Sequence, residues 1–109
     1  MKVLKKQNVL ASAFSGKLRQ ISDNWNDNLV KLGFTELDND AFVAVAHNGK
    51  DIVWWDGNSG SFICVTNAAG SDMGQSFVKA VADAYIYDAF LSEHNCEEQY
   101  ISLEDVMNL

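Results

Sequence analysis

The sequence predicts a single α+β domain with a long N-terminal helix, a three-stranded antiparallel β-meander, a second long helix and a short C-terminal helix. Three observations lead to this prediction. Residues 42–67 contain three apolar runs separated by two turn signals, apolar residues recur at helical spacing on both sides of this stretch, and a capping motif stands near the C-terminus. The chain, residues 1–109, has the length of one domain with its own core.

The N-terminal helix is predicted by large apolar side chains that recur every three or four residues. Lysines at positions 2, 5 and 6 would oppose the helix dipole, so the helix is expected to begin near residue 8 or later. It is expected to end before Gly33, because Gly33 followed by Phe34 is typical of a C-terminal glycine and its apolar follower. These apolar side chains would form one stripe along the helix, and they are Phe14, Leu18, Ile21, Trp25, Leu29 and Leu32.

Two turns set the register of the meander. Asn48-Gly49 is favoured in a two-residue type I′ hairpin, because both positions need a positive φ. The second turn, residues 57–60, has an even number of loop residues and therefore keeps each side chain on its face. Residues 34–37 are a candidate for an extra edge strand. The predicted cross-strand pairs are Val43 with Trp54, Val45 with Ile52, Trp54 with Ile63 and Ile52 with Val65.

Both faces of this sheet are predicted to be apolar. Successive strand residues point to opposite faces, so the neighbours Trp54 and Trp55 cannot share one. A sheet with one solvated face should alternate apolar and polar residues, and this one does not. Either helices cover both faces, or one apolar face is an interface, for example that of a homodimer.

The second helix is predicted over residues 73–94, with Phe77 and Tyr85 on its apolar face and Tyr87 on the opposite face. Asp88 falls inside the apolar face. Two interpretations are open: a carboxylate at the rim of the helix, or a buried acid with a raised pKa that would mark a site.

The C-terminal helix, residues 103–108, is predicted by a capping box. Ser102 would cap the helix, Asp105 stands at the third helical position, and Ile101 with Val106 occupies staple positions. Tyr100 and Ile101 are candidates for a further strand at the edge of the sheet.

The sequence contains no motif of a known enzyme chemistry. A nucleophile elbow fails on spacing, because residues 57–60 are better explained as a hairpin turn. Gly70 and Gly74 lack the lysine of a phosphate loop, and Gly60 and Asn67 stand where a calcium loop starting at Asp56 needs ligands. The two cysteines, Cys64 and Cys96, have no metal-site spacing. We therefore expect no catalytic residues, no metal and no cofactor.

The charge of the chain is strongly asymmetric. The formal net charge is −7, with +4 on residues 1–31 and −11 on residues 32–109. Such an acidic surface would repel phosphates, so direct nucleic-acid binding is not expected, whereas a basic protein partner is. No apolar run is long enough for a secretory signal or a membrane span, and a cytoplasmic location in a bacterial or host cell is expected.

These features favour a small, acidic, non-enzymatic inhibitor that acts by protein–protein binding and blocks a basic nucleic-acid-binding site of a nucleic-acid-processing machine. A short, acidic α+β chain without a catalytic motif resembles in character the phage anti-CRISPR and anti-restriction proteins. Such a protein would present carboxylates in place of phosphates, with a tryptophan as an aromatic anchor. The expected partner-binding residues are Asp38, Asp40, Asp51, Asp56, Trp54, Trp55, Glu97 and Glu98.

Two alternatives remain open from the sequence. An immunity protein that neutralises a nuclease-type toxin would have the same acidity and the same kind of basic partner. A small enzyme or ligand-binding domain would instead need a pocket on the aromatic side of the sheet, around Trp55, Phe62 and Asp88.

Overall fold

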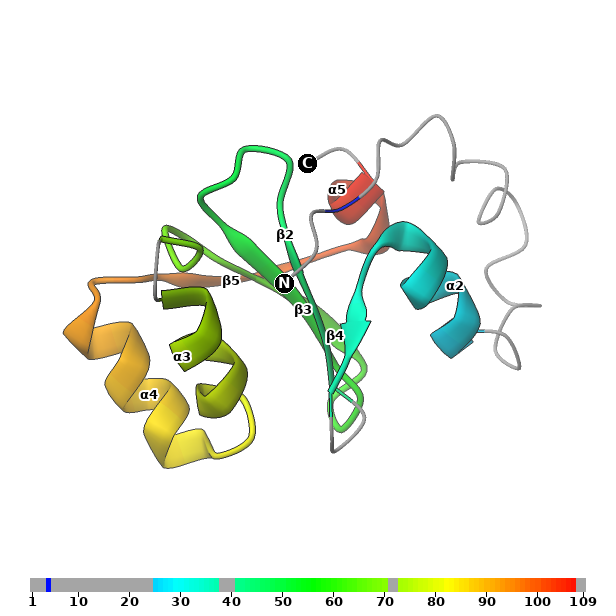
Figure 1. The fold of residues 1–109 in the computed structure, drawn as a ribbon. Helices are drawn as coiled ribbons and strands as arrows, with labels where there is room; N and C mark the ends of the chain where they lie inside the picture. Colours follow the sequence, from blue (N-terminus) through cyan, green and yellow to red (C-terminus); the bar gives the residue numbers. More distant parts are fainter. Residues whose placement is uncertain (1–3, 5–24, 38–40, 71–72, 108–109) are drawn as a thin grey trace.

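The computed structural model describes Leu4 and residues 25–37, 41–70 and 73–107, which form an antiparallel sheet with helices on both faces (Figure 1). The five strands lie in the order β1-β2-β3-β4-β5, the same order as in the chain. They are β1 Thr35–Glu36, β2 Ala41–Val45, β3 Ile52–Asp56, β4 Ser61–Val65 and β5 Glu98–Ile101.

Four helices are described, and they pack in pairs on the two faces of the sheet. They are α2 Trp25–Leu32, α3 Met73–Ala80, α4 Ala84–Glu93 and α5 Leu103–Met107. In Figure 1, α3 and α4 lie to the left of the sheet, and α2 and α5 lie to its right. Across the described residues, no helix has both the length and the apolar character needed to cross a bilayer.

The pairing of the three central strands is as the sequence predicts. Val43 lies opposite Trp54 and Val45 opposite Ile52. On the other side of β3, Trp54 lies opposite Ile63, and Ile52 opposite Val65. The predicted register is therefore confirmed over β2, β3 and β4.

The predicted type I′ turn at Asn48-Gly49 is wrong. Gly49 has a φ of 72°, but Asn48 is not among the described residues with positive φ. The Gly49 N–H donates to the Ala46 carbonyl at 2.9 Å, and the Asn48 side-chain oxygen accepts from the N–H groups of Lys50 and Asp51. These side-chain bonds favour a four-residue loop over residues 47–50. Because four and two are both even, the register is unchanged.

Helices cover both apolar faces, which decides between the two interpretations of the sheet. On the α2–α5 face, Phe42, Val53 and Phe62 pack with Leu29 of α2 and Val106 of α5. On the α3–α4 face, the strand residues include Val43, Ile52, Trp54 and Val65, and the helix residues are Phe77, Ala80, Tyr87 and Phe90. The apolar sheet face that a homodimer would have used is therefore part of the core.

The predicted fold class is wrong in its elements, although the protein is α+β. The sheet has five strands rather than three, because both candidate edge segments pair: β1 with β2 and β5 with β4. The N-terminal helix is short, since α2 has eight residues, Trp25–Leu32. Most of the long helix that was predicted, including Phe14, Leu18 and Ile21, lies outside the described residues.

The predicted helix over residues 73–94 is also wrong, because it is two helices, α3 and α4. Asp83 adopts an extended backbone, with φ −144° and ψ 123°, and is the N-cap of α4. Its carboxylate accepts from the N–H of Tyr85 at 2.8 Å and of Ile86 at 3.3 Å. An aspartate at an N-cap satisfies donors that a continuous helix would bond internally, so the chain restarts there.

This restart reverses the predicted positions of two tyrosines. Tyr87, placed on the solvent face by a continuous helix, is buried with 9% of its surface exposed. Tyr85, placed on the apolar face, is 88% exposed. The residues between α3 and α4 change the rotational phase of α4, so the periodicity of one helix cannot be extended into the other.

Two predicted helix termini are confirmed, the C-terminus of α2 and the N-terminus of α5. Gly33 has a φ of 105°, and its N–H donates to the Val30 carbonyl, while the Phe34 N–H donates to the Leu29 carbonyl, both at 3.0 Å. This is the Schellman pattern. At α5, Ser102 and Asp105 exchange the two reciprocal bonds of a capping box, each at 3.1 Å.

Removing the cap of α4 should destabilise the protein. We expect Asp83→Ala to lower the free energy of unfolding by about 1 kcal/mol, because two helix N–H groups lose their acceptor. Urea denaturation measures the change. Asp88→Ala is the matched control, since it removes the same charge from an exposed position of the same helix. Equal effects of the two substitutions would contradict the capping role.

Candidate functional site

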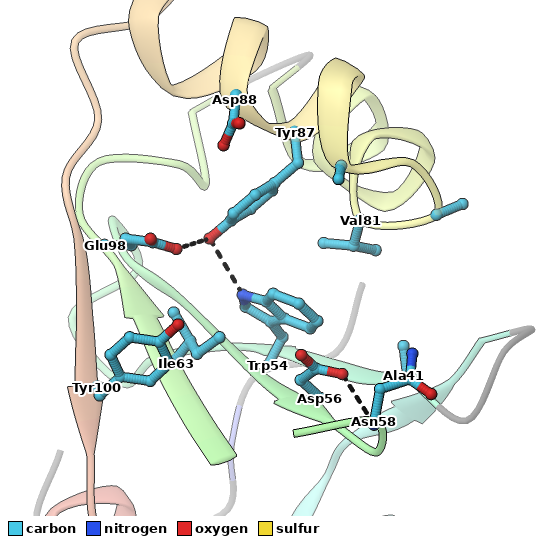
Figure 2. Close-up of a pocket in the computed structure, with 12 residues that line it drawn as sticks. Ala41, Trp54, Asp56, Asn58, Ile63, Val81, Tyr87, Asp88, Glu98 and Tyr100 are labelled. Atoms are coloured by element: carbon cyan, nitrogen blue, oxygen red, sulfur yellow. Dashed lines mark hydrogen bonds between the residues drawn. The ribbon is translucent and has the colours of Figure 1, made fainter. Parts of the chain in front are cut away.

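A depression among the described residues lies between the sheet and the α3–α4 pair, and it runs from the second turn, at Asp56 and Asn58, toward Glu98 at the start of β5. It measures about 630 Å³. Figure 2 shows residues of the strands along one side and residues of α4 and the α3–α4 connection along the other. We call it the acidic hollow, and its lining residues are Ala41, Trp54, Asp56, Asn58, Ile63, Val81, Ala82, Ala84, Tyr87, Asp88, Glu98 and Tyr100.

An aromatic cluster forms the floor of the acidic hollow. Trp54, which is 7% exposed, lies edge-on to Tyr87 with ring centroids 5.5 Å apart. Phe77 contacts both rings, at 6.5 Å from Trp54 and 6.0 Å from Tyr87. Edge-to-face pairs at these separations stabilise beyond their buried area, so this cluster fixes α4 against the sheet.

Tyr87 connects the buried floor to the surface. Its hydroxyl accepts a hydrogen bond from the Trp54 indole N–H at 3.4 Å and donates one to the Glu98 carboxylate at 2.8 Å. Figure 2 shows the ring extending from α4 toward the sheet between these two partners. Burial first, and then the hydrogen bond to Glu98, raise the pKa of Tyr87 far above its ordinary value. The phenol therefore keeps its proton and donates it in the hydrogen bond that positions the Glu98 side chain.

Three carboxylates surround this floor. Asp56 comes from the end of β3, Asp88 from α4 and Glu98 from the start of β5. Among the described residues that line the acidic hollow, none is basic. Tyr100, 66% exposed, adds an accessible aromatic surface on the same side of β5 as Glu98. Carboxylates beside an aromatic ring suit a cationic group, above all a lysine or arginine side chain.

The predicted binding residues do not all lie together. Asp56 and Glu98 line the acidic hollow, but Asp51 stands at the opposite end of β3, where its carboxylate accepts from the Asn67 N–H at 2.9 Å. Glu97 is exposed, and its carbonyl pairs with Thr66. Asp38 and Asp40 lie outside the described residues.

The two tryptophans differ in their surroundings. Trp54 is buried in the floor of the acidic hollow, so only part of its ring could meet a partner. Trp55 is half-buried on the other face, with its ring 4.7 Å from that of Phe62. The alternative pocket around Trp55, Phe62 and Asp88 is formed only in part. Trp55 and Phe62 line a depression of about 430 Å³, but Asp88 lines the acidic hollow on the other side of the sheet.

The sequence alone did not identify Tyr87, Tyr100 or the position of Asp88 in this site. Asp88 is exposed, which agrees with a rim carboxylate rather than a buried acid. The signal that would have placed them is Asp83, since reading it as an N-cap sets the phase of α4 and turns Tyr87 inward.

The described residues contain no group of three or more histidine, cysteine, aspartate or glutamate side chains arranged to hold a metal ion. What the geometry defines is a small five-stranded sheet with an acidic, aromatic depression beside one edge strand. Comparisons with protein-family models, with curated proteins and with solved structures found no match for this chain.

Removing the Tyr87 hydroxyl should cost stability because the buried Trp54 N–H loses its acceptor. We expect Tyr87→Phe to lower the free energy of unfolding by about 1–2 kcal/mol. Tyr85→Phe, which makes the same change on the exposed tyrosine of the same helix, should have an effect below about 0.5 kcal/mol. Denaturant titration of both variants tests this, and an equal loss would contradict the role of the hydroxyl.

The raised pKa of Tyr87 also predicts a loss of stability at alkaline pH. The unfolded chain releases the phenolic proton near pH 10, whereas the folded chain retains it, so the contribution is complete below that pH and is lost as pH rises above it. We expect the difference in unfolding free energy between the wild type and Tyr87→Phe to shrink as pH rises above 10. A difference that stays constant from pH 8 to 11 would contradict this.

Proposed function

We propose that this chain is a small, non-enzymatic binding protein that inhibits a nucleic-acid-processing machine by occupying a basic site on it. The observation that carries the proposal is the acidic hollow, where Asp56, Asp88 and Glu98 border an aromatic floor and no basic residue is present among the described lining. Carboxylates held on a rigid scaffold can take the place of phosphates in a basic groove.

The hollow is suited to receive one or more cationic side chains. Glu98 is held by the Tyr87 hydroxyl at 2.8 Å, so its orientation is fixed before a partner arrives. A guanidinium group beside it can pair with the carboxylate and lie against the Tyr100 ring. Preorganised groups lose less conformational entropy on binding, which favours affinity.

The charge of the whole chain supports the same class of partner. A net charge of −7 attracts a basic protein over distances comparable to the Debye length, which accelerates association at low salt. The same charge repels nucleic acid itself, so the machine rather than its nucleic-acid substrate is the proposed target.

Neutralising the hollow should weaken binding without unfolding the protein. We expect the double variant Asp88→Asn/Glu98→Gln to bind a basic partner captured from a bacterial lysate about tenfold more weakly, because two charge pairs are lost. The control variant Asp27→Asn/Glu36→Gln changes the net charge equally at exposed positions of α2 and β1. It should keep near wild-type affinity.

A competition assay between this protein and nucleic acid for the captured partner tests inhibition. The wild-type protein and the control variant should displace DNA or RNA from the captured partner in a gel-shift experiment, and the hollow variant should not. Equal loss in both variants would show that net charge alone is responsible and would contradict a site at the hollow. A nuclease-type toxin as the captured partner would make the chain an immunity protein.

A further inference from the structure

The two edges of the sheet differ in how far they are open. At one edge, β1 has only two residues, Thr35–Glu36. Further along β2, past the end of β1, the Leu4 N–H donates to the Val45 carbonyl at 2.8 Å. At the other edge, β5 has four residues, Glu98–Ile101, and pairs only with β4 in the described part of the chain. An edge strand of this kind can accept a further strand.

The hydrogen bonds between β4 and β5 determine which backbone groups of β5 point outward. The Thr66 N–H donates to the Glu97 carbonyl at 2.9 Å, and residues 66 and 97 continue the register of the β4–β5 ladder. In an antiparallel ladder, bonded and non-bonded pairs alternate. Gln99 and Ile101 therefore face β4, whereas the N–H and C=O groups of Glu98 and Tyr100 face away from the sheet.

These outward groups are without a partner in the described part of the chain, since no hydrogen bond to the backbone of Glu98 or Tyr100 is found there. All four residues of β5 are at least partly exposed. The edge thus offers two N–H donors and two C=O acceptors at the spacing of a strand, which is what strand addition requires.

Charge selects the kind of strand that this edge can accept. Glu97 and Glu98 are consecutive, so their side chains lie on opposite faces at the same end of the edge. A second copy of the chain carries the same net charge of −7 and the same acidic edge, so its approach to β5 is opposed by repulsion. A strand with lysine or arginine at alternate positions would instead place a cation beside Glu98 and Tyr100, at the mouth of the acidic hollow.

We propose that β5 is a strand-addition site, where a basic, extended segment of the partner protein pairs with the backbone of Glu98 and Tyr100. This inference rests on the proposed function and specifies how its partner is held. Backbone hydrogen bonds to β5 would supply affinity, and the carboxylates of Glu98 and of the acidic hollow would select a basic sequence.

The experiment uses the full chain and a synthetic peptide in which lysine alternates with valine. Hydrogen exchange followed by NMR should show that the amides of Glu98 and Tyr100 exchange fast in the free protein and at least about tenfold more slowly with saturating peptide. A peptide N-methylated at the alternate residues that face β5 should lose binding. The peptide methylated at the other alternate residues should keep it.

A pair of substitutions tests the same backbone from the protein side. Tyr100→Pro removes the outward N–H without removing a bond to β4, which an edge strand tolerates, and Tyr100→Ala removes only the side chain. We expect Tyr100→Pro to weaken peptide binding at least about tenfold more than Tyr100→Ala does. If Tyr100→Pro fails to fold, as judged by its thermal melt, the two N-methylated peptides alone decide whether the backbone of β5 pairs with the peptide.

The outcomes separate this inference from the proposed function. Peptide binding that depends on Asp88 and Glu98 but leaves both amides unprotected would overturn strand addition and leave the acidic hollow as the site. Binding that is insensitive to those two carboxylates would contradict the proposed function. Protection that appears without peptide and rises with protein concentration would show pairing with a second copy and would overturn the basic occupant.

Discussion

The constraint on which this fold depends is the pleat of β3, which sends Trp54 and Trp55 to opposite faces of the sheet. With apolar residues on both sides, the sheet needs two layers of cover, and the chain supplies α3–α4 on the Trp54 side and α2–α5 on the Trp55 side. The aromatic contacts of Trp54 with Phe77 and Tyr87 attach the α3–α4 pair directly to the central strand. The α3–α4 pair is thus positioned by a residue of the central strand.

This use of both faces limits where a partner can bind. A sheet of this size usually offers one open face for recognition, but here both are core, and the edges and the gaps beside the helices remain. Tyr87 bridges from α4 toward the sheet and so forms part of the floor of the acidic hollow, while its hydroxyl fixes Glu98 at the sheet edge. The buried cluster and the exposed carboxylate are therefore parts of one arrangement, and the polar surface depends on the packing beneath it.

Local signals in the sequence predicted the structure where local physics decides it. The register of β2, β3 and β4 followed from two loops of even length, and the ends of α2 and α5 followed from Gly33 and from the Ser102–Asp105 capping box. Prediction failed where a local preference competed with another. Asp83 caps α4 within a segment whose periodicity suggested one helix, so the prediction reversed which of Tyr85 and Tyr87 is buried. The β4–β5 pairing joins distant segments, and nothing local to Glu98 indicates that it lies at the acidic hollow.

The carboxylates at β5 address two physical requirements at once. An open edge strand can pair with any extended chain, including a second copy of itself, and proteins commonly place charges there to prevent it. Consecutive glutamates at positions 97 and 98 oppose pairing with an equally acidic copy on both faces of the strand, yet they favour pairing with a basic strand. In the proposed complex, the charge that protects the edge would also select the partner, and Tyr87 holds one of these two carboxylates in position from the core. The proposed specificity at this edge would thus follow from repulsion as much as from attraction.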